Sequence, residues 1–591
     1  MRDCIRPGAL WGLALGFAGT VAAGAVTWRV PEDCATIQYA LFVSAPGDTV
    51  MVAPGTYYET VLWPSTPGLC LASEAGATVT ALDGMDVESV LRLLTPVDSS
   101  TVIRGFTIQH GNAEYGGGVR CDGSSPTLEH NRIVANTATW YGGGIYCGED
   151  CRAVIRHNTI AHNRVENGSG GGIACYFNSG PIILDNTITG NQAPEYFGGG
   201  IHCENPASSP GAIEIGGNIV RENHAGGGGG MSFFSPFYPT PRVYENEISH
   251  NTSGAGGGVY AYWTLADLVG NRIEENEVPG RGGGLFAEES HELLLRDNDI
   301  CRNTAGTEGG GIALTLWTTI PTIDGNRILH NTAQSGGGVF GYYMCRPTFT
   351  SNLIAFNAAL TSGGGIYLSH DCAPTLDGDQ ILENAAGTGG GLYMTGSSVE
   401  AEGVTIARNA GSGVWIDEGR EDHPSIFTLN AFFDNEGYGM YNADAAIVPD
   451  ARSNWWGDAS GPYHPVRNPD GAGDEVSDNV EFDFWLSEPG GVCEVEGGGT
   501  PDRYRLWCEP NPTSGRTSIR FDVPAGSSGP VRFEIFDVAG RCLKTLTASA
   551  GEGRITWWGD DGRNRPVDAG IHYVRATLGP HRRLASVIIL H

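Results

Sequence analysis

The feature that most constrains this chain is a glycine-rich repeat with a period of about 27 residues. A glycine triplet followed by an apolar residue recurs at regular spacing, beginning at Gly116, Gly142, Gly170, Gly198, Gly228, Gly256, Gly282, Gly309, Gly336, Gly363 and Gly389. Degenerate copies begin at Gly411 and Gly437, and an Asn-x-Ile-x-x-Asn type element recurs with the same period. Self-similarity at a fixed period of this length is the sequence signature of a solenoid.

Each repeat is built from short segments in which apolar and polar residues alternate, such as 144–147 and 155–160, separated by Gly, Asn, Asp and Ser turns. This period of two is typical of β-strands, and the 3.6-residue period of helical repeats is missing. A coil of three short strands and three turns uses about this many residues. Stacked coils would pair parallel strands about 4.8 Å apart. The sequence therefore predicts an all-β, right-handed parallel β-helix, with the handedness taken from the rule for parallel crossovers.

The two repeated markers have different predicted roles. The Asn at a fixed turn position is expected to form a ladder of side-chain amides along the solenoid. The glycine triplet is expected to form a corner with positive φ, where a Cβ would collide with the neighbouring coil.

The ends of the solenoid must be covered. We predict a short amphipathic helix at 35–42, followed by a strand and turn at 47–57, and we interpret these elements as an N-terminal cap. The segment 453–462, which contains Trp455 and Trp456, ends the regular period and is interpreted as a C-terminal cap.

Residues 1–25 are predicted to be a signal peptide. Arg2 and Arg6 precede a small, apolar stretch at 9–22, and Ala23-Gly24-Ala25 fits the cleavage rule. The apolar stretch is short and glycine-rich for a membrane anchor, and no second apolar run of about 20 residues follows, so no transmembrane segment is predicted. We predict a protein that is secreted or held at a bacterial cell surface.

The β-helix with its caps is predicted over 26–490, followed by a glycine-rich linker at 491–501. Residues 502–591 contain alternating segments such as 518–523 and 533–541, which predict a small β-sandwich.

Composition restricts the partners. The chain has 35 Lys and Arg residues against 67 Asp and Glu residues, a formal net charge of −32. Because nucleic-acid binding needs clustered positive charge, no nucleic-acid partner is predicted.

Cysteines are numerous but do not have zinc-type spacing. The pairs Cys34 with Cys70 and Cys493 with Cys508 are candidate disulfide bridges, and Cys147 with Cys151 could close a turn or bind a metal. We predict no metal site and no cofactor, although calcium stays open as a ligand of carboxylate-rich turns.

Strand parity separates inward from outward positions after each glycine triplet. The inward third position is cysteine in four consecutive coils, namely Cys121, Cys147, Cys175 and Cys203. We interpret these residues as core thiols, because free cysteine packs as a small hydrophobe, with a metal or redox ladder as the alternative.

The outward second position is mostly aromatic, and further aromatic residues lie two positions along. The predicted carbohydrate-contact residues are Tyr260, Tyr262, Phe286, Phe340, Tyr342, Tyr367, Tyr393, Trp415 and Tyr441. A row of exposed rings marks an interaction site and suits the faces of sugars. The alternatives are that turn loops fold over the row, or that aromatic residues simply favour sheets.

The chain resembles two groups of proteins. The opening motifs Thr-Ile-Gln, Gly-Asp-Thr-Val and Pro-Gly-Thr-Tyr, the coils, and the closing Asn-Trp-Trp-Gly and Ser-Gly-Pro resemble the pectate-lyase-like superfamily of β-helix proteins. The pairing of Gly-Gly-Gly-Ile with Ile-x-x-Asn is similar to the repeats of bacterial polymorphic outer-membrane proteins, which are adhesins. The resemblance covers roughly 27–486 and implies the fold. It does not imply one activity, because the superfamily mixes lyases, hydrolases, epimerases and non-enzymes.

The C-terminal module resembles the Ig-like domain of hook-capping proteins and of type IX secretion cargo, through 518–523, 533–541, 557–559 and 569–573. In the second family such a domain directs outer-membrane export or surface attachment, so the resemblance implies a sorting or anchoring role, with a spacer as the alternative.

Acidic, imidazole and guanidinium groups lie beside the aromatic row. The acid/base candidates are Glu288, Glu289, His291, Arg346, His370 and Asp371. Paired carboxylates could hydrolyse a glycoside, and Arg346 could act as the base of a lyase by analogy with the superfamily's arginine. The motif sets that we associate with polygalacturonases, pectate lyases and epimerases are missing, and solvated turn residues are the simpler interpretation. We therefore favour a non-catalytic protein that binds polysaccharide or another cell surface, with a polysaccharide lyase or glycoside hydrolase as the alternative.

Overall fold

The computed structural model describes residues 24–489, except 205–212, 235–239, 291, 316–319 and 421, and most of the strands and short connections of 505–589. The chain divides into two compact units, Met1–Gly491 and Val492–His591. The predicted signal peptide lies almost wholly outside the described residues, as do the linker and Cys493.

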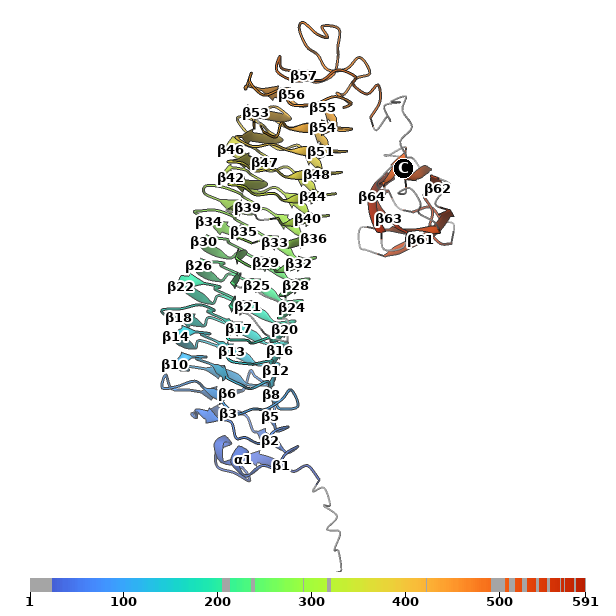
Figure 1. The fold of residues 1–591 in the computed structure, drawn as a ribbon. Coiled ribbons are helices and arrows are strands. Elements are labelled where there is room, and N and C mark those ends of the chain that lie inside the picture. Colours follow the sequence, from blue (N-terminus) through green and yellow to red (C-terminus); the bar gives the residue numbers. More distant parts are fainter. Residues whose placement is uncertain are drawn as a thin grey trace, which may run out of the picture. The chain divides into compact units, whose positions relative to one another are not determined.

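The first unit is a parallel β-solenoid of stacked coils (Figure 1). Over the described residues, sheet A runs from β1 (Thr27–Val30) to β54 (Ile426–Thr428), and sheet B runs from β3 (Gly55–Tyr57) to β55 (Ala431–Phe433). Each strand pairs in parallel with the equivalent strands of the coils before and after it. This finding confirms the prediction of an all-β parallel solenoid.

Sheet C carries the functional candidates on its outer face. Its described strands are β4 (Val61–Leu62), β7 (Leu91–Leu93), β11 (Val119–Cys121), β15 (Ile145–Cys147), β19 (Ile173–Tyr176), β23 (Ile201–Glu204), β27 (Met231–Phe234), β31 (Val259–Tyr262), β35 (Leu285–Glu288), β39 (Ile312–Thr315), β43 (Val339–Tyr342), β47 (Ile366–Ser369), β50 (Leu392–Thr395), β53 (Val414–Glu418), β56 (Tyr438–Asn442) and β57 (Glu475–Val476).

A fourth sheet, sheet D, was not predicted. Its described strands are β10 (Asn112–Tyr115), β14 (Thr137–Tyr141), β18 (Arg164–Val165), β22 (Gln192–Phe197), β26 (His224–Gly227), β30 (Thr252–Ala255), β34 (Glu277–Val278), β38 (Thr304–Ala305), β42 (Thr332–Ser335) and β46 (Ala358–Ser362). The prediction of three strands per coil is therefore wrong for these coils. Several of these strands are short, irregular or glycine-containing, so their alternation is weak in the sequence.

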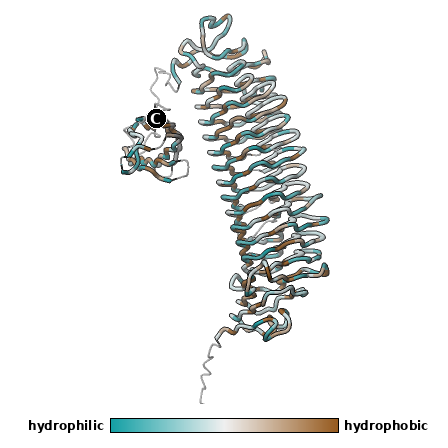
Figure 2. Tube along the Cα trace, turned by 180° about the vertical axis from the view of Figure 1, so that it is seen from behind, coloured by the Kyte–Doolittle hydropathy of each residue, from teal (hydrophilic) through white to brown (hydrophobic). Residues whose placement is uncertain are grey.

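One coil illustrates how the sequence turns its corners. β12 (Thr127–Glu129) of sheet A leads into β13 (Arg132–Val134) of sheet B, and β13 leads into β14 of sheet D. Each corner is a residue with positive φ, His130 or Ala135 at 55°, followed by a buried Asn. Figure 2 shows apolar and polar positions recurring along such coils.

The corner asparagines form two ladders rather than one. At the second corner, the Asn136 amide nitrogen Nδ2 donates to Asn163 Oδ1 at 3.0 Å and to the Ile108 carbonyl at 3.0 Å. At the first corner, Asn131 Nδ2 donates to Asn158 Oδ1 at 3.2 Å. The predicted amide ladder is confirmed, and the first Asn of the repeated element supplies the additional one. These bonds satisfy backbone and amide groups that would otherwise be buried without partners.

The glycine triplets form the corner between sheets D and C. Gly142 has a φ of 68°, and a Cβ on Gly143 would lie 2.5 Å from the Gly171 carbonyl oxygen of the next coil. Both parts of the glycine prediction are confirmed, because the first residue needs the left-handed region and the second needs the absence of a side chain.

The interior is a continuous apolar core. Cys121, Cys147, Cys175 and Cys203 are at most 2% exposed and belong to this core, which confirms their interpretation as core thiols. Cys34 packs in the core, whereas Cys70 precedes the inward-facing Leu71 on β5 (Cys70–Ser73) and points outward. Both are free thiols, so the bridge expected between them is not formed.

The ends differ in part from the expected caps. α1 (Ile37–Val43) is the predicted helix, with Thr36 as its N-cap. The segment after α1 is a regular coil, because β2 (Thr49–Val52) and β3 already belong to sheets A and B. At the other end, the buried Trp456 stacks on Phe432 with ring centroids 4.6 Å apart. Among the described residues, no helix has the length and apolar character needed to cross a membrane.

The second unit contains two small antiparallel sheets in its described part. One consists of β58 (Arg505–Glu509), β59 (Thr517–Asp522) and β62 (Arg554–Trp557). The other contains β61 (Cys542–Ser549), β60 (Pro530–Phe536), β63 (Gly570–Leu578) and β64 (His581–Ile589). Phe521, Phe533 and Trp557 are fully buried in its core.

Candidate functional site

The outer face of sheet C presents a row of side chains in register from coil to coil. Tyr260 of β31 lies opposite Phe286 of β35 across the parallel pair. Val259 and Ala261 belong to the main core, whereas Tyr260 belongs to a separate apolar cluster outside it. The predicted parity is therefore confirmed for these strands.

Part of this row is covered. Tyr260, Phe286 and Phe340 are only 8%, 6% and 4% exposed, so the prediction of an exposed row is wrong for these three rings. Phe197 and Ala255, the last residues of two sheet D strands, pack against the cluster that contains Tyr260 and Phe286. Sheet D returns to sheet C through the glycine corner, and its last residues fold onto the outer face there.

The rings nearer the C-terminal end of the solenoid are partly exposed, as are Tyr262 and Tyr342 two positions along. Tyr367 stacks on Phe340 at 5.1 Å and on Tyr393 at 5.0 Å between ring centroids. Trp415 stacks on Tyr441 at 4.1 Å. Because the rings lie face to face along the solenoid, they present their edges to solvent rather than their faces.

Carboxylates lie close to these phenols. Burial raises the pKa of Tyr393, and the charge of Asp417 raises it further. Burial also raises the pKa of Tyr367, to which Asp417 and Glu308 contribute. The exposed edges therefore combine neutral phenol donors with carboxylate acceptors.

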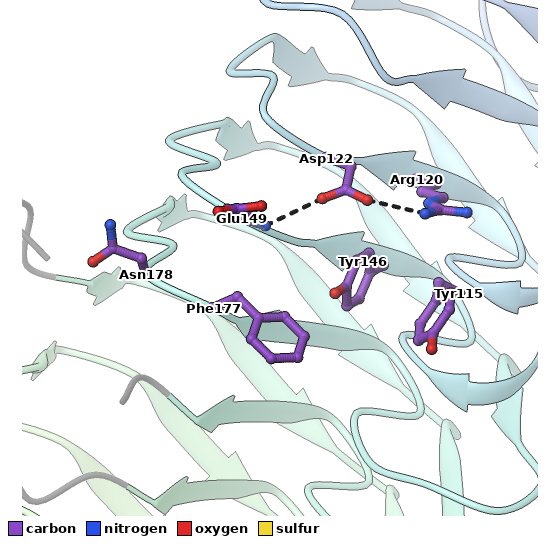
Figure 3. A pocket seen from close by; sticks show the side chains of 7 residues that line it. All are labelled: Tyr115, Arg120, Asp122, Tyr146, Glu149, Phe177 and Asn178. Carbon is purple, nitrogen blue, oxygen red and sulfur yellow. Dashed lines mark hydrogen bonds and ion pairs between the residues drawn. The ribbon is translucent and has the colours of Figure 1, made fainter. Parts of the chain in front are cut away.

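A concave site lies on the same face near the N-terminal coils, with a volume of about 550 Å³. Figure 3 shows the side chains that line it: Tyr115, Arg120, Asp122, Tyr146, Glu149, Phe177 and Asn178. They come from the end of β10, from β11 and β15, and from the turns that follow strands of sheet C. An adjoining cavity of about 410 Å³ shares Arg120, Asp122 and Glu149.

The polar groups of this site are held in place by one another. Arg120 Nη2 donates to Asp122 Oδ2 at 2.9 Å, and Asp122 Oδ1 accepts from the Glu149 backbone nitrogen at 3.2 Å (Figure 3). The Arg120 guanidinium lies 5.3 Å from the centroid of the Tyr115 ring. The site thus has a positioned ion pair on one side.

The aromatic groups complete the site. Tyr115 and Tyr146 are 5.3 Å apart between ring centroids, and burial raises the pKa of Tyr146, so its phenol stays neutral. Phe177, which is 50% exposed, also lines the concave surface. Small-ligand sites combine apolar walls with a few placed polar groups in this way.

Comparison with known proteins places the chain in a family. The family described as "Right handed beta helix region" matches residues 82–271, 242–387 and 345–454. The chain belongs to this β-helix family. It is also 38% identical over 72 residues to the probable outer membrane protein PmpB of Chlamydia trachomatis serovar D, a match that covers 12% of this chain and 4% of that protein.

The acid/base candidates of this β-helix protein do not assemble into one group in the described contacts. Glu288 Oε2 accepts a hydrogen bond from the Tyr260 hydroxyl at 2.5 Å. The exposed ring of His370 packs against Tyr342 at 4.7 Å between centroids. Asp371 lies 3.5 Å from the Arg420 guanidinium.

The remaining candidates lie in turns. Glu289 has a φ of 51°, and Arg346 is exposed in the turn after β43. His291 lies outside the described residues. The structure therefore gives Glu288 and Asp371 partners of their own, the Tyr260 hydroxyl and the Arg420 guanidinium.

Ser232, His202 and Glu204 lie close together in the order of a catalytic triad, but Ser232 and His202 are buried. His202 Nδ1 lies 2.7 Å from Ser232 Oγ, and His202 Nε2 lies 3.5 Å from Glu204 Oε2. Ser232 is 0% and His202 is 1% exposed, and burial lowers the pKa of His202. A nucleophile at this position would not reach a bound polymer. We therefore interpret these contacts as structural, because they link consecutive coils.

The concave site was missed by the sequence analysis because Tyr115 and Phe177 do not occupy the outward positions of sheet C. One signal could have found part of it. Tyr115, Tyr141 and Phe197 each stand directly before a glycine triplet. Aromatic residues at that position recur because they end sheet D strands and fold onto the outer face of sheet C.

Proposed function

We propose that this β-helix protein is a secreted or surface-held, non-catalytic protein that binds polysaccharide along the outer face of sheet C. The observation that carries the proposal is the concave site of Figure 3, which is lined by both the exposed ring of Phe177 and the Arg120–Asp122 ion pair.

The chemistry of the site suits a sugar. A pyranose has an apolar face and a rim of hydroxyls, so it needs a ring to pack on and fixed donors and acceptors around it. Phe177 supplies the ring, Arg120 supplies N–H donors, and Asp122 and Glu149 supply acceptors. Carboxylates outnumber guanidinium groups here, which favours a neutral sugar over an anionic one. Calcium stays open as a ligand of such turns.

A long polymer has further places to bind on the same face. The edges of Tyr367, Tyr393, Trp415 and Tyr441 offer phenol and indole donors near Asp417. Individually weak contacts along one rigid surface add up for a polymer that spans them.

The cellular location is part of the proposal. The signal peptide predicted at 1–25, the Ig-like sandwich predicted at 502–591 with its sorting or anchoring role, and the similarity to an outer membrane protein support attachment at a bacterial surface. Deleting 503–591 is expected to release the β-helix from cells, as measured by fractionation. Unchanged localisation would reduce the module to a spacer.

A glycan array with the mature chain identifies the ligand class. Retention in affinity gels then compares Phe177→Ala with Phe356→Ala, a matched control whose ring is 45% exposed outside the concave site. We expect the first variant to lose retention and the second to keep it. Equal retention of both variants would remove the concave site from the proposal.

A further inference from the structure

A column of small, buried residues follows sheet C at one turn position. Its described members are hydroxyl or thiol residues with 0% exposure: Ser124, Cys151, Ser179, Thr264, Ser290, Cys345, Cys372 and Ser397. In this column a side chain bonds the backbone of the preceding coil, as where Ser397 Oγ accepts from the Cys372 nitrogen at 3.3 Å. Serine and cysteine thus fit the same space.

Two neighbouring members of the column are both cysteine. Cys345 follows β43 and Cys372 follows β47, and these strands pair in register. The Ala373 nitrogen donates to the Cys345 carbonyl at 3.0 Å, so the two turns are also fixed to each other. Both are free thiols in the structure, as Cys34 and Cys70 are, but their Sγ atoms are only 2.8 Å apart.

We propose that Cys345 and Cys372 form a disulfide that links two consecutive coils. A movement of less than about 1 Å brings the sulfurs to the bonding distance of about 2.05 Å. The oxidant is a disulfide donor, such as a thiol–disulfide oxidoreductase in its disulfide form or oxidised glutathione. The donor's S–S bond breaks, the new S–S bond forms, and both thiol protons end on the two sulfurs of the reduced donor.

The timing follows from burial. The contact with Cys372, together with burial, raises the pKa of Cys345, and both side chains are inaccessible in the folded protein. Because thiolates are the reacting species, exchange in the folded state is slow. The bond is therefore expected to form while the coil is closing.

The position of the disulfide indicates which part of the solenoid it stabilises. The last strand of sheet D, β46, lies between the two cysteines in the sequence. The same coils carry Phe340 and Tyr367, whose rings stack at 5.1 Å. The bond closes a segment of 27 residues where sheet D passes from named strands to isolated bridges such as Ala358–Ala385, and it fixes the register of those two rings.

Peptide mapping of the full chain tests the link directly. The protein is folded with oxidised and reduced glutathione, then denatured and alkylated without reductant, and its peptides are identified by mass spectrometry. We expect Cys345 and Cys372 in one linked peptide pair, and Cys301, which lies by Glu274 at 3.7 Å, alkylated. Alkylation of both cysteines, or pairing of either one with another thiol, would overturn the proposal.

Matched variants give a second measurement. Cys345→Ser/Cys372→Ser is expected to fold, because serine occupies the column in other coils, and to unfold at lower temperature than the oxidised parent. The loss corresponds to roughly a hundredfold in the unfolding equilibrium. Under reducing conditions this difference should vanish. A difference that persists equally with reductant would show that the column's packing, and not a bond, is responsible.

Discussion

The coils that carry sheet D and the coils that follow it differ in how they treat the same face of sheet C. Where sheet D is present, its terminal residues cover rings such as Tyr260 and Phe286. Beyond β46 no named sheet D strand is found among the described residues, and Tyr393, Trp415 and Tyr441 are partly exposed. One outward position therefore builds a second small core in one region and a solvent-facing edge in the other.

The first-corner ladder changes in the same place. It runs through asparagines as far as Asn352, is interrupted by Asp379 and Val404, and resumes at Asn430 and Asn454. Asp379 is fully buried and accepts from the backbone and side-chain nitrogens of Asn352, both at 2.8 Å. The difference between the regions thus extends from the surface to the interior.

The largest expected effect tests this ladder position. Burial raises the pKa of Asp379 to about 7. The folded protein therefore holds a proton that the unfolded chain releases from about pH 4 upward, so stability falls as the pH rises between about 4 and 7. Asp379→Asn is expected to raise the free energy of unfolding at pH 8 by roughly 3–4 kcal/mol over the parent, and far less at pH 4.

Urea denaturation across this pH range measures the effect, with Asp470→Asn, an exposed aspartate far along the chain, as the control. If Asp379→Asn and the parent lose stability in parallel from pH 4 to pH 8, Asp379 is ionised in the folded protein and the ladder argument is wrong.

The next effect contrasts the two kinds of ring. Phe286→Ala leaves a hole in a covered cluster and is expected to lower the free energy of unfolding by about 3 kcal/mol. Tyr393→Ala removes a partly exposed ring and is expected to cost about 1 kcal/mol. Urea midpoints check both variants. Equal losses would mean that sheet D does not divide the face into two environments.

A smaller effect concerns binding. Arg120→Ala is expected to weaken polysaccharide retention about tenfold, equivalent to about 1.4 kcal/mol. Tyr367→Ala/Tyr393→Ala is expected to weaken it about threefold, because these rings offer only their edges. Affinity gels with graded ligand measure both variants. A larger loss for the ring pair would move the main contact to the C-terminal coils.

The last prediction is that no catalytic turnover of glycans is detected. Incubation with uronate-containing or neutral glycans should release no unsaturated or reducing ends, because Glu288 and Asp371 are each engaged by a partner, the Tyr260 hydroxyl and the Arg420 guanidinium. Product formation that disappears in Glu288→Gln or Asp371→Asn would replace the binding proposal with the enzymatic alternative.

Much of the solenoid could be predicted from the sequence because its determinants repeat. The glycine and asparagine positions are visible by their period, and each has a local physical reason that needs no knowledge of distant contacts. At Gly143 a Cβ would collide with the Gly171 carbonyl of the next coil. The Asn136 amide donates to the Ile108 carbonyl of the preceding coil and to Asn163 Oδ1 of the next coil.

The exposure of the outer face could not be predicted in the same way. Whether Tyr260 is covered depends on Ala255 and on Phe197 of an earlier coil, and both belong to a sheet that alternation alone did not reveal. The concave site has the same cause, since Phe177 and Tyr115 come from a turn and from the end of a sheet D strand. The alternation along a strand determines whether a side chain points inward or outward. It does not determine whether residues of another sheet cover that side chain.

The ladder spacing has a consequence for how such a chain can vary. Successive asparagines of the second ladder are 25 to 32 residues apart, and the longest step, Asn191 to Asn223, contains the longest connection between sheets C and A, from Glu204 to Glu214. Additions are absorbed mainly in this connection, and to a smaller extent in sheet D, where the pairing of β22 with β26 shifts between Ala193 and Phe197, while the rungs keep their alignment. The connection between sheets C and A is therefore a natural graft point, where a foreign peptide could be displayed at a chosen height along the solenoid without disturbing the coils on either side.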